Sequence, residues 1–463
     1  MSIHWAIWVL VAVTLDGETW TRFRGPNGSG VAEGVSSYPV EFGAGRNVVW
    51  SRAMSAGKSS PVLTNSVLFL TAEERDRLIT ICVDRETGKT LWERWVERAR
   101  KEFRHSLNSG AASTPVTDGE NVYSFFADFG LISYDGKGKE RWRQPLGPFT
   151  SLWGMAASPM LAAGAVVLQM DGLGESAIAA FDQRTGKQRW RVARPPFVLN
   201  YTTPFVRRAG GVEEIVAMGS GKLVGYDAET GAERWSREGP GGSTVASAGM
   251  TNSSVYLVNF LTEAPPSFES QLKGRDKNGD GKLSPDEFGG GETARLYQGI
   301  GDSSGNKDGV LEAAEWSSAW SSWGGRPSVT AFSLPGGSSG AKAEQLWSYQ
   351  RNLPRAPSPV VWDGILYFVA NGGILTALDG QSGAVVKAGR LEGALDNYYS
   401  SPVMAGGNLY VCSENGKMVV VKPGAEWKVA AVNDLGEECY ATPAFSAGRI
   451  FVRTAARLFS FGR

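Results

Sequence analysis

One acidic loop has the residue types and spacing of a calcium site. Residues 276–287 (DKNGDGKLSPDE) place oxygen-bearing side chains at positions 1, 3, 5, 9 and 12 and glycine at position 6. Calcium binds hard oxygen ligands around a compact turn, with a backbone carbonyl at position 7 and a glutamate at position 12 that can supply two oxygens. The loop therefore predicts an EF-hand calcium site at Asp276, Asn278, Asp280, Lys282, Ser284 and Glu287.

A second loop of the same length follows at residues 304–315 (SGNKDGVLEAAE). Its first position is Ser304 where an aspartate is usual, which removes a charged ligand and should weaken binding. Asp302 could take over that role, so occupancy of this loop stays open. The glycines at 289–291 predict a compact paired module. The remaining candidate ligands are Asn306, Asp308, Val310 and Glu315.

The sequence has few histidines and cysteines, the residues on which zinc sites, catalytic triads and disulfide frameworks depend. The chain has two histidines, His4 and His105, which excludes a multi-histidine zinc site and leaves a Ser-His-Asp triad only through His105. Its three cysteines, Cys82, Cys412 and Cys439, are too scattered for a disulfide framework or a CxxC site. We therefore predict no catalytic residues.

A short turn recurs along the chain. Residues 182–190 (DQRTGKQRW) read as a hairpin, because aspartate accepts hydrogen bonds from turn amides and glycine supplies a positive φ. The same pattern occurs at 84–92 and 227–235, and shortened copies at 135–142 and 379–383.

A second recurrent feature is a Ser/Thr-Pro pair that opens a β-run. The spacing between successive pairs is about 41 to 54 residues except for one long gap, and such a period with four β-runs is the signature of a β-propeller. The pairs begin at Ser60, Thr114, Ser158, Thr203, Ser358, Ser401 and Thr442. Ser247-Ala248 lies in the long gap, where the spacing predicts an eighth pair, and we call these eight positions slots.

Eight slots predict an all-β, eight-bladed propeller over residues 47–463. The last blade lacks an outer strand, and residues 47–52 have the missing pattern, so we expect the two ends of the chain to pair and close the ring. The EF-hand-like insertion, residues 267–323, falls within blade 5.

Tryptophans should pack between neighbouring blades. The candidates are Trp92, Trp142, Trp190, Trp235, Trp347 and Trp427.

The N-terminal part predicts export. Residues 1–19 contain an apolar run of signal-peptide length, and residues 20–46 form an irregular lead segment rich in glycine and proline. We expect a monomer in the periplasm or outside the cell, with no membrane span. Since 47 basic residues balance 47 acidic ones, nothing favours a nucleic-acid partner.

With its turns, tryptophans and eight slots, the chain resembles the PQQ-like repeat propellers. That superfamily contains quinoprotein alcohol dehydrogenases and the BamB-type scaffold of outer-membrane barrel assembly, and the lead segment and insertion resemble an exported bacterial subgroup. Quinoprotein dehydrogenases carry an adjacent Cys-Cys pair at the cofactor, which this chain lacks. The resemblance therefore implies the fold, and PQQ is not expected as a cofactor.

Residues that precede the innermost strands should line one mouth of the central channel, the usual ligand position in a propeller. Mixed aromatic rings, amides and single charges suit a sugar, a peptide or another small polar ligand. The candidates for binding are Lys58, His105, Asn108, Trp153, Tyr201, Arg355, Tyr398, Tyr399 and Tyr440.

The leading hypothesis is a calcium-binding scaffold or binding propeller for an unidentified protein, peptide or carbohydrate. The alternative is a PQQ-dependent oxidoreductase. A hydrolase or lyase in the channel mouth remains a third possibility, for which the scarcity of histidine is unfavourable.

Ring closure can be tested by truncation. Deletion of residues 47–52 should remove the strand that completes the last blade, because no other β-run can replace it. We expect cooperative unfolding at a markedly lower temperature, measured by circular dichroism. An unchanged melting curve would contradict closure.

Overall fold

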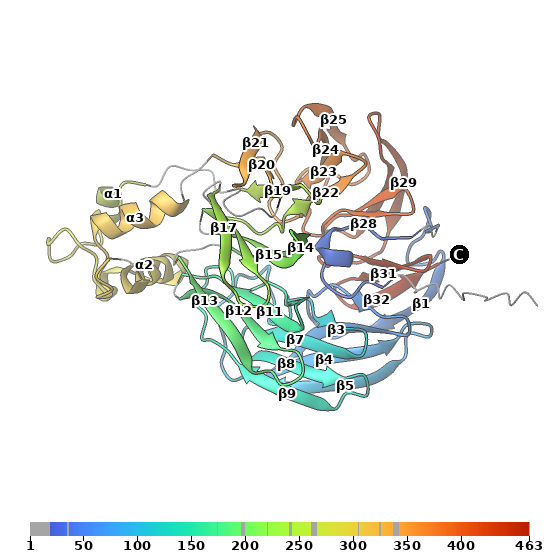
Figure 1. Cartoon of the computed structure of the whole chain (residues 1–463), viewed down its shortest axis with the longest axis horizontal. Helices are drawn as coiled ribbons and strands as arrows, with labels where there is room; N and C mark the ends of the chain where they lie inside the picture. Colours follow the sequence, from blue (N-terminus) through green and yellow to red (C-terminus); the bar gives the residue numbers. More distant parts are fainter. Residues whose placement is uncertain are drawn as a thin grey trace, which may run out of the picture.

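The computed structural model shows eight four-stranded antiparallel sheets (Figure 1). The structure describes residues 19–462 except 35–36, 174, 196–199, 220, 240–242, 261–265, 304, 324–325 and 337–341. The predicted signal peptide thus lies almost wholly outside the described residues. The all-β, eight-bladed propeller predicted from the sequence is confirmed.

The first four blades each follow the order of the chain from the inner to the outer strand. Blade 1 contains β2 (Val62–Leu63), β3 (Val67–Glu74), β4 (Arg77–Asp84) and β5 (Thr90–Glu97). Blade 2 contains β6 (Val116–Thr117), β7 (Asn121–Phe126), β8 (Gly130–Asp135) and β9 (Glu140–Pro145). Blade 3 contains β10 (Met160–Ala162), β11 (Ala165–Met170), β12 (Ser176–Asp182) and β13 (Gln188–Arg194). Blade 4 contains β14 (Phe205–Ala209), β15 (Val212–Gly219), β16 (Lys222–Asp227) and β17 (Glu233–Glu238).

The second half repeats this order until the last sheet, whose outer strand comes from the N-terminal part of the chain. Blade 5 contains β18 (Gly249–Met250), β19 (Ser254–Asn259), β20 (Ser328–Ser333) and β21 (Glu344–Tyr349). Blade 6 contains β22 (Val360–Trp362), β23 (Ile365–Ala370), β24 (Ile374–Asp379) and β25 (Val385–Arg390). Blade 7 contains β26 (Val403–Ala405), β27 (Asn408–Cys412), β28 (Lys417–Lys422) and β29 (Lys428–Asp434). Blade 8 contains β30 (Ala444–Ser446), β31 (Arg449–Arg453), β32 (Arg457–Phe461) and β1 (Val48–Ala53).

A ring of hydrogen bonds around the channel explains the recurrent Ser and Thr. In every slot the backbone N–H donates to the side-chain hydroxyl of the next slot, at 2.9–3.1 Å, and Thr442 donates to Ser60 to complete the circle. Ser247 takes part although alanine follows it, because the ring needs the hydroxyl and not the proline. The assignment of an eighth slot to Ser247 is therefore correct.

The recurrent turn is shaped by a tryptophan from the preceding blade. The indole Nε1 of Trp142 donates to Gln183 O at 2.9 Å, and a methyl group on Gly186 would lie 2.6 Å from the Trp142 ring. Gly186 has φ 72°, so this corner needs glycine both for its conformation and for the close approach. The same pairing joins Trp50 to Gly88, Trp92 to Gly138, Trp190 to Gly231 and Trp347 to Gly383.

Two of the predicted tryptophan anchors depart from this pattern. The indole of Trp235 donates to Glu214 Oε1 within its own blade, at 2.8 Å. Trp427 packs against Gly389 of blade 6, and its buried Nε1 has no hydrogen-bond partner in the part of the chain that the structure describes. Apolar clusters nevertheless fill the spaces between blades, as when Trp92 of blade 1 packs with Tyr134 of blade 2.

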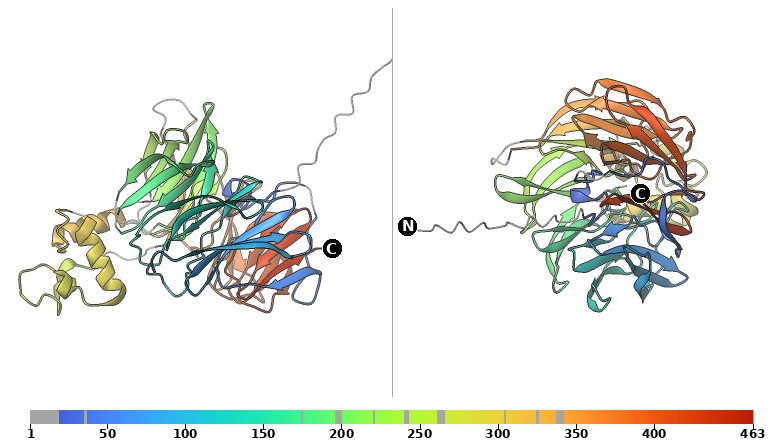
Figure 2. Two further views of the ribbon diagram at one scale, coloured as in Figure 1. Left: turned by 90° about the horizontal axis from the view of Figure 1, so that it is seen from below. Right: turned by 90° about the vertical axis from the view of Figure 1, so that its right-hand side faces the viewer.

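Three helices lie between β19 and β20 and project from one side of the propeller (Figures 1 and 2). They are α1 (Phe268–Leu272), α2 (Gly291–Ser303) and α3 (Ala313–Trp323), with a 3₁₀ turn at Pro285–Glu287, and a further 3₁₀ turn, η1 (Pro26–Gly28), lies in the lead segment. None of the helices in the described part of the chain has the length and apolar character that a bilayer crossing requires.

The hydroxyl ring can be tested at Ser358. Replacement Ser358→Ala leaves the buried N–H of Ser247 without an acceptor, which should cost about 1–3 kcal/mol of unfolding free energy in a denaturant titration. Ser358→Thr keeps the hydroxyl that other slots already use, and we expect a much smaller loss. Equal losses of unfolding free energy in the two variants would show that the hydrogen bond from Ser247 N to the hydroxyl at position 358 contributes little to stability.

Candidate functional site

The lead segment closes one end of the channel. A guanidinium N–H of Arg22 donates to Pro204 O at 2.6 Å, and Arg24 donates to Ala248 O at 3.2 Å and Pro359 O at 2.5 Å. Burial lowers the pKa of Arg22 to about 10 and that of Arg24 to about 9. These arginines hold the segment against the first strands of three successive blades.

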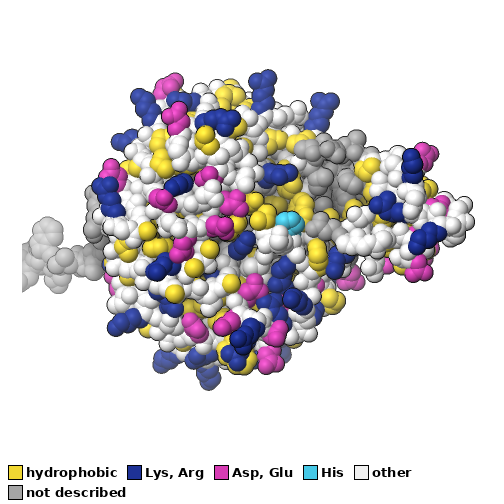
Figure 3. Space-filling view, turned by 180° about the vertical axis from the view of Figure 1, so that it is seen from behind, with side chains coloured by type: hydrophobic (Ala, Val, Ile, Leu, Met, Phe, Trp, Pro, Cys, Tyr) yellow, Lys and Arg dark blue, Asp and Glu magenta, His cyan; other side chains and the backbone are white. Residues whose placement is uncertain are grey.

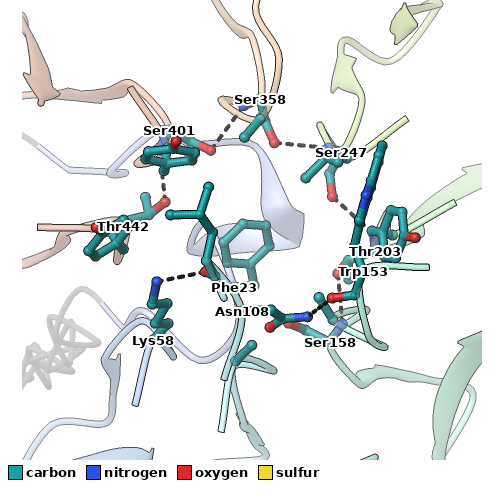
Figure 4. A pocket seen from close by; sticks show the side chains of 18 of the residues that line it. Phe23, Lys58, Asn108, Trp153, Ser158, Thr203, Ser247, Ser358, Ser401 and Thr442 are labelled. Carbon is teal, nitrogen blue, oxygen red and sulfur yellow. Dashed lines mark hydrogen bonds between the residues drawn. The ribbon is translucent and has the colours of Figure 1, made fainter. Parts of the chain in front are cut away.

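A cavity of about 420 Å³ lies on the channel axis, surrounded by the hydroxyl ring (Figure 4). Phe23 from the lead segment lies at the centre of the ring and lines the cavity. On the outer face, hydrophobic side chains gather in a hollow beside a histidine, next to the helical insertion (Figure 3). The lead segment, through Phe23, therefore forms the inner end of the cavity.

An aromatic stack forms one wall. The ring of Trp153 lies 5.4 Å from Tyr201 and 5.7 Å from Phe260, and both pairs are nearly parallel. The hydroxyl of Ser151 donates to the Tyr201 oxygen at 3.3 Å. Such rings offer a large, stiff apolar surface.

The opposite wall carries a cation over a tyrosine. Lys58 Nζ lies 3.6 Å from the centre of the Tyr440 ring and donates to Leu107 O at 2.6 Å. Burial lowers the pKa of Lys58, whereas Glu438 and Glu414 oppose this shift. Burial raises the pKa of Tyr440, whose hydroxyl donates to both glutamates.

The segment that enters blade 2 supports the aromatic wall. Asn108 Nδ2 donates to Trp153 O at 2.7 Å and to Gly154 O at 3.1 Å, and Nδ1 of His105 accepts a hydrogen bond from Leu107 N. His105 thus helps to shape a turn, and no nucleophile is hydrogen-bonded to its ring in the described structure.

The structure brings together all the predicted binding residues except Tyr398. Lys58, His105, Asn108, Trp153, Tyr201, Arg355, Tyr399 and Tyr440 line the cavity. Tyr398 is buried in the core and donates to Ala394 O at 2.6 Å, because adjacent residues of an extended segment face opposite sides. Burial raises its pKa.

Sequence reasoning missed several lining residues, namely Phe23, Leu107, Val245, Phe260 and Asn371. Phe23 belongs to no repeat, so no periodic signal pointed to it. Asn371 and Phe260 directly follow the second strands of their blades. They would have been found if the loop after each second strand had been counted among the predicted channel-mouth residues.

The described lining residues include no aspartate, glutamate or cysteine. The three cysteines are buried elsewhere as free thiols. The cavity therefore offers aromatic surface, amides, hydroxyls and cations, a set suited to holding a ligand.

The first acidic loop has the geometry of a preformed turn. Asp276 accepts hydrogen bonds from Gly279 N at 2.7 Å and Gly281 N at 3.0 Å. Glu287 accepts from Ser284 N and Lys277 N, and these backbone donors lower its pKa to about 2. The same backbone N–H groups hold the Glu287 carboxylate in place at the end of the loop.

The second loop repeats the same hydrogen bonds. Asn278 Oδ1 accepts from Asp280 N at 3.0 Å, and Asn306 Oδ1 accepts from Asp308 N at 3.1 Å. The backbone N–H groups of Lys282 and Val310, at position 7 of their loops, each donate to the aspartate two residues earlier at 2.8 Å. Ser304 lies outside the described residues.

A buried carboxylate distinguishes the second loop. Glu315 is buried, its Oε2 accepts a hydrogen bond from Glu312 N at 3.2 Å, and its Oε1 has no hydrogen-bond partner among the described residues. That oxygen points into the loop, since it lies 2.3 Å from where a methyl group on Gly305 would be. Burial raises the pKa of Glu315, and Asp308 and Glu312 add to the shift.

The two loops are joined back to back. Leu283 N donates to Leu311 O at 3.0 Å, and Leu311 N donates to Leu283 O at 2.8 Å. Each leucine is position 8 of its loop. Among the described residues no three acidic, histidine or cysteine side chains converge on one point.

Comparison with protein families gives one match over more than half of the chain. The model described as "Outer membrane protein assembly factor BamB" matches residues 77–260 and 337–461. A comparison with curated proteins finds no match.

Solved structures share the fold at low identity. BamB from Moraxella catarrhalis is 11% identical with a TM-score of 0.54, over 89% of this chain and 98% of that one. A europium-containing methanol dehydrogenase is 9% identical with a TM-score of 0.60, over 96% and 98%. The designed Ika8 protein is 11% identical with a TM-score of 0.54, over 90% and 100%. At these identities the likeness shows the fold alone.

Proposed function

The chain belongs to the PQQ-like repeat family described by the BamB model, and on that premise we propose that it is an exported, calcium-binding propeller that holds a ligand in its central cavity. The ligand is a segment of a protein, a short peptide or a carbohydrate. The propeller supplies the cavity, and the helical insertion supplies the calcium site.

The composition of the cavity carries this proposal. A cavity of about 420 Å³ is large enough for a few peptide residues or one or two sugar rings, and pockets of this size are typical small-ligand sites. Its walls combine stacked aromatic rings with fixed amides and two cations, Lys58 and Arg355. Its described lining residues include no carboxylate and no cysteine, and the His105 ring accepts a hydrogen bond from the backbone N–H of Leu107.

Ligand binding can be tested with arrays of short peptides and of glycans. We expect one of these classes to bind, and Trp153→Ala to weaken that binding by about tenfold or more, because the change removes the centre of the aromatic wall. The equilibrium constant would be measured by fluorescence polarisation with the labelled array member.

Trp95→Ala is the matched control, because Trp95 is an exposed tryptophan on β5 and does not line the cavity. Its affinity should equal that of the unmodified protein. Equal effects of the two replacements, or no binder in either array, would overturn the proposal.

A PQQ-dependent oxidoreductase is the alternative function. In quinoproteins a bound quinone would be held with a metal ion, and the described lining residues include no carboxylate for that ion and no adjacent cysteines. The residues present do not fit the group. Incubation with PQQ and calcium should therefore leave no retained chromophore after gel filtration and no dye reduction with alcohols; either signal would favour the oxidoreductase.

Several observations support calcium binding by the insertion. The first loop supplies carboxylate and amide oxygens around two glycines with positive φ, Gly279 and Gly281, and no heavy atom lies within 4 Å of the Cβ positions of these glycines. The buried, unpartnered oxygen of Glu315 is costly in a metal-free loop and would be satisfied by a cation. Calcium binds such sets of carboxylate, amide and carbonyl oxygens.

Asp302 supplies the charge that Ser304 lacks in the second loop. In the first loop Asp276 accepts from Gly281, the glycine at position 6. In the second loop the position-6 glycine is Gly309, and Asp302 Oδ1 lies 3.3 Å from where its methyl group would be. Asp302 therefore lies beside the same turn glycine, although the N–H of Gly309 donates to Gly301 O at 3.1 Å and not to Asp302.

Calorimetric titration of metal-free protein with calcium tests these assignments. We expect one ion per loop. Glu287→Gln should abolish the first site, whereas Glu315→Gln and Asp302→Asn should each abolish or strongly weaken the second, because each change removes a charged ligand.

Asp286→Asn is the control, since Asp286 is an exposed acid of the first loop at position 11, which is not a ligand position. It should retain both sites. Absence of heat in the unmodified protein would refute calcium binding, and an Asp302→Asn variant with two unchanged sites would refute the role of Asp302.

A further inference from the structure

The apolar core of the insertion continues into the wall of the central cavity. Leu283 and Leu311 from the paired loops and Tyr297 from α2 belong to the same buried cluster as Leu173 and Tyr201 of the propeller. Trp153, Ala156 and Val245 pack against that cluster and also line the cavity. The insertion and the cavity therefore share side chains.

Helix α2 touches the propeller through a glycine. A methyl group on Gly299 would lie 2.8 Å from Leu173 Cβ, so the helix backbone rests directly on the leucine side chain. Leu173 N donates to Thr150 O at 2.8 Å, which fixes Leu173 to the segment that leads to Trp153. Helix α2 and the segment that leads to the aromatic wall therefore meet at Leu173.

A second contact of α2 involves the segment that supports the aromatic wall. The guanidinium of Arg295, also on α2, lies 4.0 Å from the centre of the Phe103 ring. Phe103 precedes His105 and Asn108, and Asn108 holds the backbone of Trp153. Both contacts of α2 converge on residues 150–156.

The position of α2 depends on the two calcium loops. The first loop ends four residues before α2 begins at Gly291, and the second follows its last residue, Ser303. The loops are also joined to each other through Leu283 and Leu311, whose side chains lie in the shared core. Ordering of the loops therefore fixes both ends of the helix.

We infer that calcium bound in the insertion stabilises the cavity wall formed by residues 150–156 and Tyr201, and so regulates ligand binding in the cavity. This inference rests on the proposed calcium binding. Because such coupling is reciprocal, a ligand that needs the ordered wall must also raise the affinity for calcium. The insertion then acts as a calcium-dependent regulator of the cavity.

Hydrogen exchange measured by mass spectrometry tests the inference without a known ligand. Full-length protein would be compared with a chelator and with saturating calcium. We expect calcium to slow exchange in residues 150–156 and 200–203 by about fivefold or more, in addition to protecting the insertion. Strands β27 and β28 on blade 7 should not change, because none of their residues belongs to the shared core.

Three variants separate the coupling between the insertion and the cavity from a general loss of stability. Leu173→Ala removes the Cγ and Cδ atoms that pack against α2, and Leu409→Ala removes the same atoms from an equally buried leucine of blade 7. We expect both variants to bind calcium, but only Leu173→Ala to lose the calcium-dependent protection of residues 150–156. Gly299→Ala pushes α2 away from Leu173 without removing any propeller atom, and it should reduce the same protection.

The outcomes distinguish the inference from the function on which it rests. If calorimetry shows no calcium binding, the proposed calcium site fails. If calcium binds and protects the insertion but not residues 150–156, the inference is overturned and the calcium site stands. Unchanged protection in both Leu173→Ala and Gly299→Ala would also overturn it.

Discussion

Each blade of this propeller presents one backbone N–H and one hydroxyl to its neighbours at the channel. Because the N–H of each slot donates to the hydroxyl of the next, the eight hydrogen bonds form a closed circle. A buried amide without an acceptor is costly, so no blade can be displaced without leaving two partners unsatisfied. The ring sets the spacing of the inner strands and thereby the width of the cavity.

At the outer edge of the propeller, tryptophan side chains connect neighbouring blades. A tryptophan from one blade covers the turn glycine of the next and donates to a carbonyl at its corner, as Trp142 does over Gly186. Hydroxyls thus join the blades at the axis and indoles join them at the rim. These repeated contacts leave the lead segment, the channel-mouth loops and the insertion free to differ.

The proposed function depends on these unrepeated parts. Phe23 lines the inner end of the cavity, stacked rings form its wall, and the insertion packs behind that wall. If the insertion had no role in the cavity, its hydrophobic core would not need to include side chains of the propeller. Here Leu173 and Tyr201 belong to both, which gives the loops a physical route to the cavity.

The sequence by itself determined the repeated architecture, because period and turn chemistry are local. The Ser/Thr-Pro pairs gave the number of blades, and even Ser247 could be assigned to its slot by spacing. Most channel-mouth residues were also predictable, since their places relative to the inner strands repeat. Only the tertiary structure decided that Tyr398 faces the core while Tyr399 faces the cavity, because alternation in an extended segment has no fixed phase until the segment packs. It alone placed Phe23 at the channel axis, since the lead segment belongs to no repeat and no local pattern specifies its position relative to the blades.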